Sequence, residues 1–85
     1  MLYRIYTERK RIKEIKKIVS RQYDGFTLTG ATGYWRNTRE KSLIIEVVTE
    51  GNELPTIRAI AERIKSLNNQ EAVLVQEIAN NQIMV

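Results

Sequence analysis

The order of hydrophobic patterns in this chain predicts an α+β domain built as strand–helix–strand–strand–helix–strand. Two segments of helical period, near residues 8–23 and 55–67, each lie between short stretches rich in β-branched and aromatic residues. The length of 85 residues fits one domain, so we treat residues 1–85 as a single unit. The expected result is a four-stranded antiparallel sheet with two helices on one face.

The first half of the chain provides a strand, a helix and a second strand. Residues 2–7 have strand composition, and Thr7 is expected to cap the following helix. Apolar residues at spacings of three and four predict that helix over residues 8–23, with Gly25 ending it in a left-handed conformation. Residues 26–35 predict a strand that Gly30 and Gly33 interrupt, by a bulge, a bend or a close approach.

The second half repeats the pattern. A polar turn is expected over residues 36–40, and residues 42–49 are the clearest strand. Pro55 suits the start of a helix that Asn68 and Asn69 close, and residues 72–75 begin the fourth strand. Residues 80–81 offer another turn, with residues 82–85 as an optional short edge strand. This order is that of the ferredoxin-like fold.

The composition removes several classes of chemistry. The chain has no cysteine and no histidine, which excludes disulfides, thiolate metal sites, Ser-His-Asp triads and Cys-His pairs. No pair of carboxylates suits acid–base work, so we predict no catalytic residue, no metal, no cofactor and no enzyme activity. Charged residues follow soon after Met1, which argues against a signal peptide or membrane span and favours the cytoplasm.

The strand pattern predicts self-association. In residues 42–49, Ile44 and Val48 lie on the face opposite to Leu43, Ile45 and Val47, and residues 72–75 are apolar on both faces. Two helices can cover only one face of such a sheet. We therefore expect copies of the chain to cover the other face in a symmetric homo-oligomer.

Positive charge is concentrated in the first half. Residues 1–41 hold 11 Lys and Arg against 4 acidic residues, whereas residues 42–85 hold 3 against 6. Such an excess favours an anionic partner, although a solvated helix face would have the same composition.

The stretch around residues 29–41 is the predicted ligand site. Its glycines permit close approach to main-chain N–H groups, its threonines donate hydrogen bonds, its aromatic rings can stack on a base, and its cations can hold an anion. Trp35 suits a subunit interface as well as a ligand. The predicted ligand-binding residues are Thr29, Gly30, Thr32, Gly33, Tyr34, Trp35, Arg36, Arg39 and Lys41.

Three segments resemble the PII-like superfamily, which includes the nitrogen-regulatory PII signal proteins and the CutA proteins. They are the glycine-rich second strand, residues 25–28 with residues 33–36, and the approach to the last strand over residues 69–75. The resemblance implies a trimer whose sheets face inward and a nucleotide or similar anion bound between subunits. Only residues 36–41 join the second and third strands here, so the long regulatory loop of the PII signal proteins is missing. The lack of His and Cys also weakens a copper role.

The function that we predict is a small oligomer that binds or sequesters a nucleotide-like anionic signalling molecule in clefts between subunits. One alternative is a nucleic-acid-binding domain that uses the basic first helix, although the third strand lacks the aromatic signature of RNA-recognition domains. Another alternative is a purely structural or interaction oligomer. Nucleic acid and membrane are not the expected partners.

Overall fold

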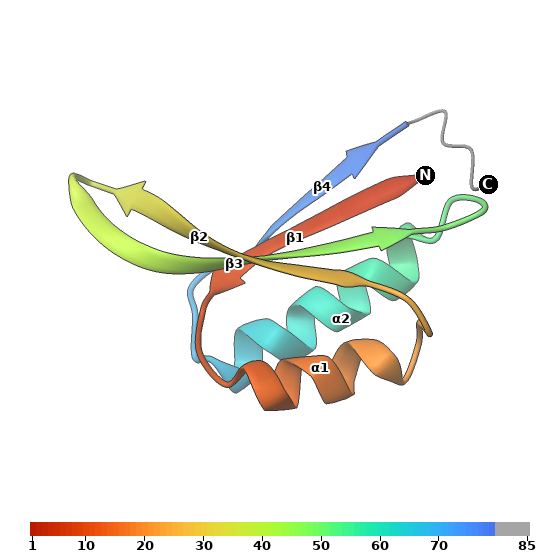
Figure 1. Cartoon of the computed structure of the whole chain (residues 1–85), viewed down its shortest axis with the longest axis horizontal. Coiled ribbons are helices and arrows are strands. Elements are labelled where there is room, and N and C mark those ends of the chain that lie inside the picture. The colour runs from red at the N-terminus through yellow and green to blue at the C-terminus, as the bar shows by residue number, and fades with distance from the viewer. Residues whose placement is uncertain (80–85) are drawn as a thin grey trace.

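The computed structural model describes residues 1–79 and confirms the predicted α+β fold. The elements are β1 (Leu2–Glu8), α1 (Ile12–Ser20), β2 (Thr27–Trp35), β3 (Thr38–Val48), α2 (Leu54–Leu67) and β4 (Leu74–Ile78). The strands form one antiparallel sheet in the order β2-β3-β1-β4. Both helices lie on the same side of this sheet (Figure 1), as the ferredoxin-like arrangement requires. We call this side the helix face, and the other side the open face.

The core lies between the helix face and the two helices. The alternation of the strands places every second side chain of β1, and of β3 from Leu43 onward, in it, because successive side chains of a strand point to opposite faces. Burying one such aliphatic side chain contributes about 1.5–3 kcal/mol. The buried apolar residues are Tyr3, Ile5, Leu43, Ile45 and Val47 from the sheet and Ile15, Val19, Ile57, Ile60, Ala61 and Ile64 from the helices.

Helix α1 is shorter than predicted, and both of its predicted caps are wrong. Thr7 lies inside β1, because β1 pairs with β3 as far as Glu8 opposite Ser42. The residue before the helix is Arg11, in a left-handed conformation with φ 53°. At the other end the helix stops at Ser20, and Gly25 does not have a positive φ.

The β2–β3 connection is a two-residue turn, tighter than the predicted turn over residues 36–40. Arg36 and Asn37 both have positive φ, 50° and 62°, which is the conformation that joins strands in tight hairpins. Strand β2 keeps a continuous register with β3 from Thr27 to Trp35, so Gly30 and Gly33 mark no bulge. They leave room for side chains: an added Cβ would meet Arg9 at Gly30 and Ser42 at Gly33.

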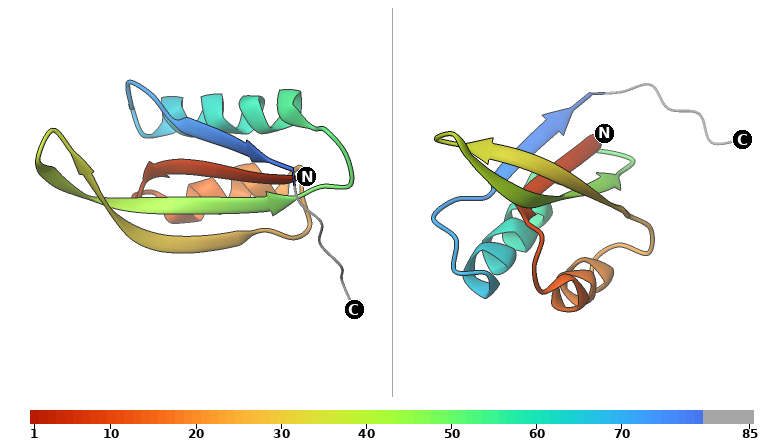
Figure 2. Two further views of the ribbon diagram at one scale, coloured as in Figure 1. Left: turned by 90° about the horizontal axis from the view of Figure 1, so that it is seen from above. Right: turned by 60° about the vertical axis from the view of Figure 1, so that its left-hand side comes forward.

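The β2–β3 hairpin extends past the ends of both helices. Figures 1 and 2 show its tip far from α1 and α2, at the end of the molecule opposite to the β3–α2 connection. Strand β3 reaches the tip at Thr38, which pairs with Trp35. The overhanging part of the hairpin therefore exposes both of its faces.

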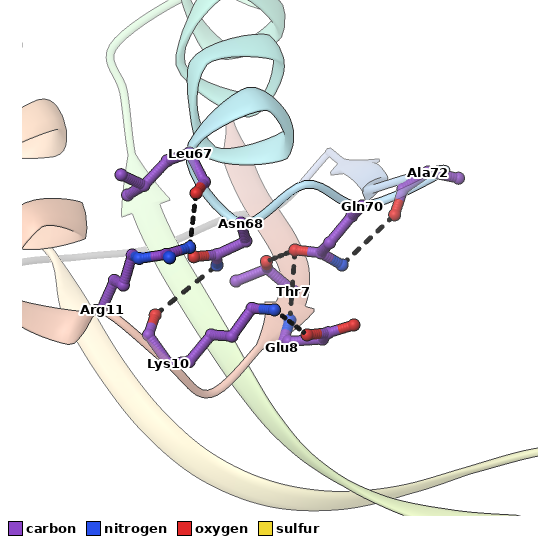
Figure 3. Close-up of polar contacts among 8 residues, drawn as sticks. All are labelled: Thr7, Glu8, Lys10, Arg11, Leu67, Asn68, Gln70 and Ala72. Carbon is purple, nitrogen blue, oxygen red and sulfur yellow. Dashed lines mark hydrogen bonds and ion pairs between the residues drawn. The ribbon is translucent and has the colours of Figure 1, made fainter.

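A polar cluster fixes the turn between β1 and α1 to the end of α2 (Figure 3). The Arg11 guanidinium donates to Leu67 O at 2.6 Å, and Asn68 Nδ2 donates to Lys10 O at 3.5 Å. The side-chain oxygen of Gln70 accepts a hydrogen bond from the Thr7 hydroxyl and one at 3.5 Å from the Glu8 N–H. These contacts determine where the chain leaves β1, and hence where Arg9 lies.

The second half of the chain agrees more closely with the sequence prediction. Helix α2 has Pro55 in its first turn and ends at Leu67, and Asn69 takes a left-handed conformation with φ 52°. Strand β4 covers Leu74–Ile78, so it begins two residues after the predicted start at residue 72. The predicted turn at residues 80–81 and the edge strand at residues 82–85 lie outside the described residues.

Candidate functional site

All nine predicted ligand-binding residues lie on the β2–β3 hairpin, but the register divides them between its two faces. Gly30 lies opposite Leu43, which is buried on the helix face, whereas Thr29 lies opposite Ile44 on the open face. Because side chains alternate along a strand, the same division continues to the tip. Gly30, Thr32, Tyr34, Arg39 and Lys41 belong to the helix face, Thr29, Gly33 and Trp35 belong to the open face, and Arg36 lies in the turn.

The helix-face side of the overhang gathers cations and hydroxyls. Thr32 lies directly opposite Lys41, and Tyr34 lies directly opposite Arg39, so neighbouring side chains combine a hydroxyl with a cation. Arg9, which directly follows β1, joins them: its N–H donates to Lys41 O at 3.0 Å and its guanidinium lies against Gly30. We call this set the basic hairpin face. It comprises Arg9, Thr32, Tyr34, Arg39 and Lys41.

The charge of this face is not neutralised by ion pairs within residues 1–79. The two ion pairs there are Arg4 with Glu46 and Lys10 with Glu8. Arg39 and Lys41 are two residues apart on one strand, about 6.6 Å along its axis, so both can reach a single phosphate or diphosphate. A guanidinium can also bind two phosphate oxygens at once.

The open-face side of the hairpin has a different character. Trp35 is 65% exposed, and the Arg36 guanidinium lies over its ring at 5.4 Å from the centroid. Glu40 lies on this side opposite Gly33. Trp35 and Tyr34 therefore cannot stack on the same ligand from one protomer, and Tyr34 is the ring on the same side as Arg39 and Lys41.

The open face of the sheet carries two apolar rows. Tyr6 lies between Ile44 and Leu74 in one row, and Leu2 lies between Val48 and Ile78 in the other. Leu74 is 63% exposed and Val48 is 52% exposed. The predicted apolar character of the second face is therefore confirmed for β3, and on β4 it is confirmed at Leu74.

A half-buried ion pair separates these rows. Arg4 Nε donates to Glu46 Oε2 at 2.9 Å, and this hydrogen bond raises the pKa of Arg4 above its ordinary value. Neither Arg4 nor Glu46 is among the residues that the sequence predicts for a site. The alternation along β1 indicates that Arg4 lies on the face opposite to its buried neighbours Tyr3 and Ile5.

Arg9 is the other residue that sequence reasoning missed. It lies in a run of charged residues after β1, and only the pairing of β1 with β3 brings it to the hairpin.

Within residues 1–79, no group of three or more acidic side chains forms a metal site. No helix in that part of the chain is long and apolar enough to cross a membrane.

No protein-family model and no curated protein matches the chain, but solved structures share its fold. A phage SAM lyase in its apo state is 19% identical, with a TM-score of 0.70 over 87% of this chain and 75% of that chain. A DUF3240 family protein from Shewanella baltica is 12% identical, with a TM-score of 0.70 over 99% of this chain and 94% of that one. The designed protein Foldit4 is 20% identical, with a TM-score of 0.54 over 94% of each chain.

These likenesses establish a small ferredoxin-like fold. The resemblance to PII-like proteins stays a prediction, as does the absence of enzyme activity, because one structure with this fold bears the name of an enzyme.

Proposed function

We propose that this chain is a cytoplasmic ligand-binding oligomer that holds a nucleotide-like anion on the basic hairpin face. One observation carries the proposal: Arg9, Arg39 and Lys41 share one side of an exposed hairpin with two hydroxyl groups. In the proposed complex the cations bind the phosphates, Thr32 donates to a phosphate oxygen, and the base stacks on Tyr34. Tyr34 is 72% exposed, so its ring is accessible for stacking.

One apolar row supports the oligomeric part of the proposal. In a closed assembly the open faces of neighbouring copies would cover the row formed by Tyr6, Ile44 and Leu74. The overhanging hairpin reaches beyond the helices of its own protomer (Figure 2), so it would meet a neighbouring copy through the Trp35 side. The basic hairpin face would then border a cleft between subunits, with a trimer as the favoured assembly.

The test is a thermal-shift panel of nucleoside triphosphates, cyclic dinucleotides and S-adenosylmethionine, with an Arg39→Gln/Lys41→Gln variant. A nucleotide in excess of its dissociation constant should raise the midpoint temperature by several degrees, and the variant should lose that shift. Lys16→Gln/Lys17→Gln, which removes two exposed cations from α1, is the matched control. The absence of a shift across the panel would contradict the proposal.

The same control tests the nucleic-acid alternative. If oligonucleotides bind in a salt-dependent manner and the α1 variant loses that binding, the basic helix is the binding surface and the hairpin is not.

A second candidate function follows from the phage enzyme. The SAM lyase and this chain share their fold with a TM-score of 0.70, which supports S-adenosylmethionine as a ligand or substrate here. Incubation of the oligomer with S-adenosylmethionine, followed by mass spectrometry, distinguishes binding from cleavage. Intact ligand recovered with the protein supports capture, whereas breakdown products made in proportion to enzyme concentration support a lyase.

A further inference from the structure

A groove of about 610 Å³ opens at the edge of the open face, away from the basic hairpin face. It lies where the connection between α1 and β2 passes the first residues of β1 and the last residues of β3. Its walls combine charged and apolar side chains. The lining includes Leu2, Arg4, Asp24, Phe26, Glu46 and Val48.

The Arg4–Glu46 pair provides opposite charges side by side in this groove. Their hydrogen bond joins Nε to Oε2, which uses one of the five N–H donors of the guanidinium and one of the two carboxylate oxygens. The side chains are 36% and 30% exposed, so the charges are partly shielded from water yet accessible. A partly buried ion pair contributes little net stability, because desolvation offsets much of the Coulomb attraction.

The lining also limits which ligand can bind. Glu46 and Asp24 provide two carboxylates against the one guanidinium of Arg4, so a phosphate group is disfavoured here, in contrast to the basic hairpin face. A simple cation could pair with the carboxylates, but it would leave the free N–H donors of Arg4 without an acceptor. A group that carries both charges on neighbouring atoms can satisfy the guanidinium and a carboxylate together.

We propose that this groove binds the zwitterionic end of an α-amino acid. The ligand carboxylate would accept hydrogen bonds from the terminal nitrogens of Arg4, and its ammonium group would donate to the carboxylate of Glu46. Asp24 provides a second acceptor for the ammonium group. Phe26, Leu2 and Val48 would contact an apolar side chain, so the ligand class is an α-amino acid with an apolar side chain or an adenosylated derivative of one.

This inference goes beyond the proposed anion site and uses none of its residues. The experiment is an NMR titration of the uniformly ¹⁵N-labelled full chain with L-methionine, N-acetyl-L-methionine and L-methioninamide, following the amides of Gly25 and Thr27, which also line the groove. We expect saturable shifts with L-methionine and binding at least about tenfold weaker for each blocked derivative, because each lacks one of the two charges.

Two variants test whether L-methionine binds in the groove. Glu46→Gln keeps the size of the side chain and removes its charge, so it should weaken L-methionine binding about tenfold. Glu40→Gln makes the same change on the same strand and the same face, at an exposed position outside the groove, and should leave binding unchanged. Arg39→Gln should also leave it unchanged, so failure of the anion site and failure of this groove are distinguishable.

A final arm compares L-methionine with S-adenosylmethionine. Tighter binding of S-adenosylmethionine identifies an adenosylated ligand, and equal affinities identify the free amino acid; both support the zwitterion site. The proposal is overturned if no free α-amino acid gives saturable shifts, or if the blocked derivatives bind as well as L-methionine.

Discussion

The guanidinium of Arg9 occupies the space that a side chain at Gly30 would fill. A Cβ built on Gly30 would collide with Arg9 Nη1, and the Arg9 Cζ and Cδ atoms would lie at 3.5 and 3.6 Å from it. The glycine thus lets a cation from the end of β1 lie across β2, next to Lys41. Arg9 and Gly30 are 21 positions apart in the sequence, and the sheet alone brings them together.

Gly30→Ala should therefore separate folding from binding. The methyl group displaces only the end of a flexible arginine, and alanine in a strand is favoured over glycine by up to about 1 kcal/mol. We expect an unfolding midpoint in urea that is unchanged or slightly higher, together with a nucleotide affinity that is about tenfold weaker. Isothermal titration calorimetry and urea unfolding on the same preparation measure the two quantities.

Gly51→Ala is the control, because an added Cβ there meets nothing within 4 Å and the glycine does not have a positive φ. It should change neither quantity. If Gly30→Ala binds nucleotide as tightly as the parent chain, Arg9 is not part of the site.

The candidate site shows what the sequence reveals and what it does not. Residues 29–41 are conspicuous in composition, and alternation along a strand separates Tyr34 from Trp35 once the register is known. Sequence reasoning listed both rings as stacking partners, because it did not carry the alternation through the glycines. Arg9 could not be assigned, because it depends on the pairing of β1 with β3 across more than 30 residues.

Assembly should depend on the open-face row that contains Leu74. Leu74→Glu places a charge in the row that Tyr6 and Ile44 continue, and burying an unpaired carboxylate at an interface is costly. We expect the variant to shift from an oligomer to single subunits in analytical ultracentrifugation at micromolar concentration. Ala59→Glu, which adds the same charge to an exposed position of α2, should keep the oligomer. A parent chain that already sediments as a single subunit would contradict the prediction.

The fold itself follows from local pattern with few errors, and the errors have a common cause. The order of the six elements and the position of α2 agree with the apolar periodicity, and so does β3 from residue 42 onward, whereas its polar residues 38–41 were not predicted as strand. Thr7 was assigned to a helix cap because threonine suits that position, but pairing with β3 and the partner Gln70 keep it in β1. Both contacts come from distant parts of the chain, so no local pattern could reveal them.

Gln70→Ala tests the contact between Gln70 and the end of β1. It removes the acceptor for the Thr7 hydroxyl and for the Glu8 N–H, and should lower the free energy of unfolding by about 1–2 kcal/mol. Urea unfolding followed by circular dichroism measures the change. Gln22→Ala, at an exposed position in the α1–β2 connection, should have an effect below about 0.5 kcal/mol. Equal effects of the two substitutions would show that Gln70 does not stabilise the end of β1.

Two tyrosines that meet at Glu53 should make the fold sensitive to alkaline pH. Burial raises the pKa of the Tyr3 phenol above 10.0, and burial together with the hydrogen bond to Glu53 raises that of Tyr23. Tyr3 accepts a hydrogen bond from the Glu53 N–H at 2.9 Å, and Tyr23 donates to Glu53 Oε1 at 2.8 Å. The folded state therefore holds these phenol protons to a higher pH than the unfolded state does.

The stabilisation is consequently complete below the unfolded pKa of about 10 and decreases as the pH rises above it. Tyr23→Phe should make the decrease above pH 10 shallower, at a cost of about 1 kcal/mol at neutral pH for the lost hydrogen bond. Tyr34→Phe, which removes the hydroxyl of a side chain that is 72% exposed, is the matched control. Urea unfolding at a series of pH values gives each slope. A Tyr23→Phe slope as steep as that of the parent chain would mean that the Tyr23 phenol does not hold its proton more tightly in the folded state.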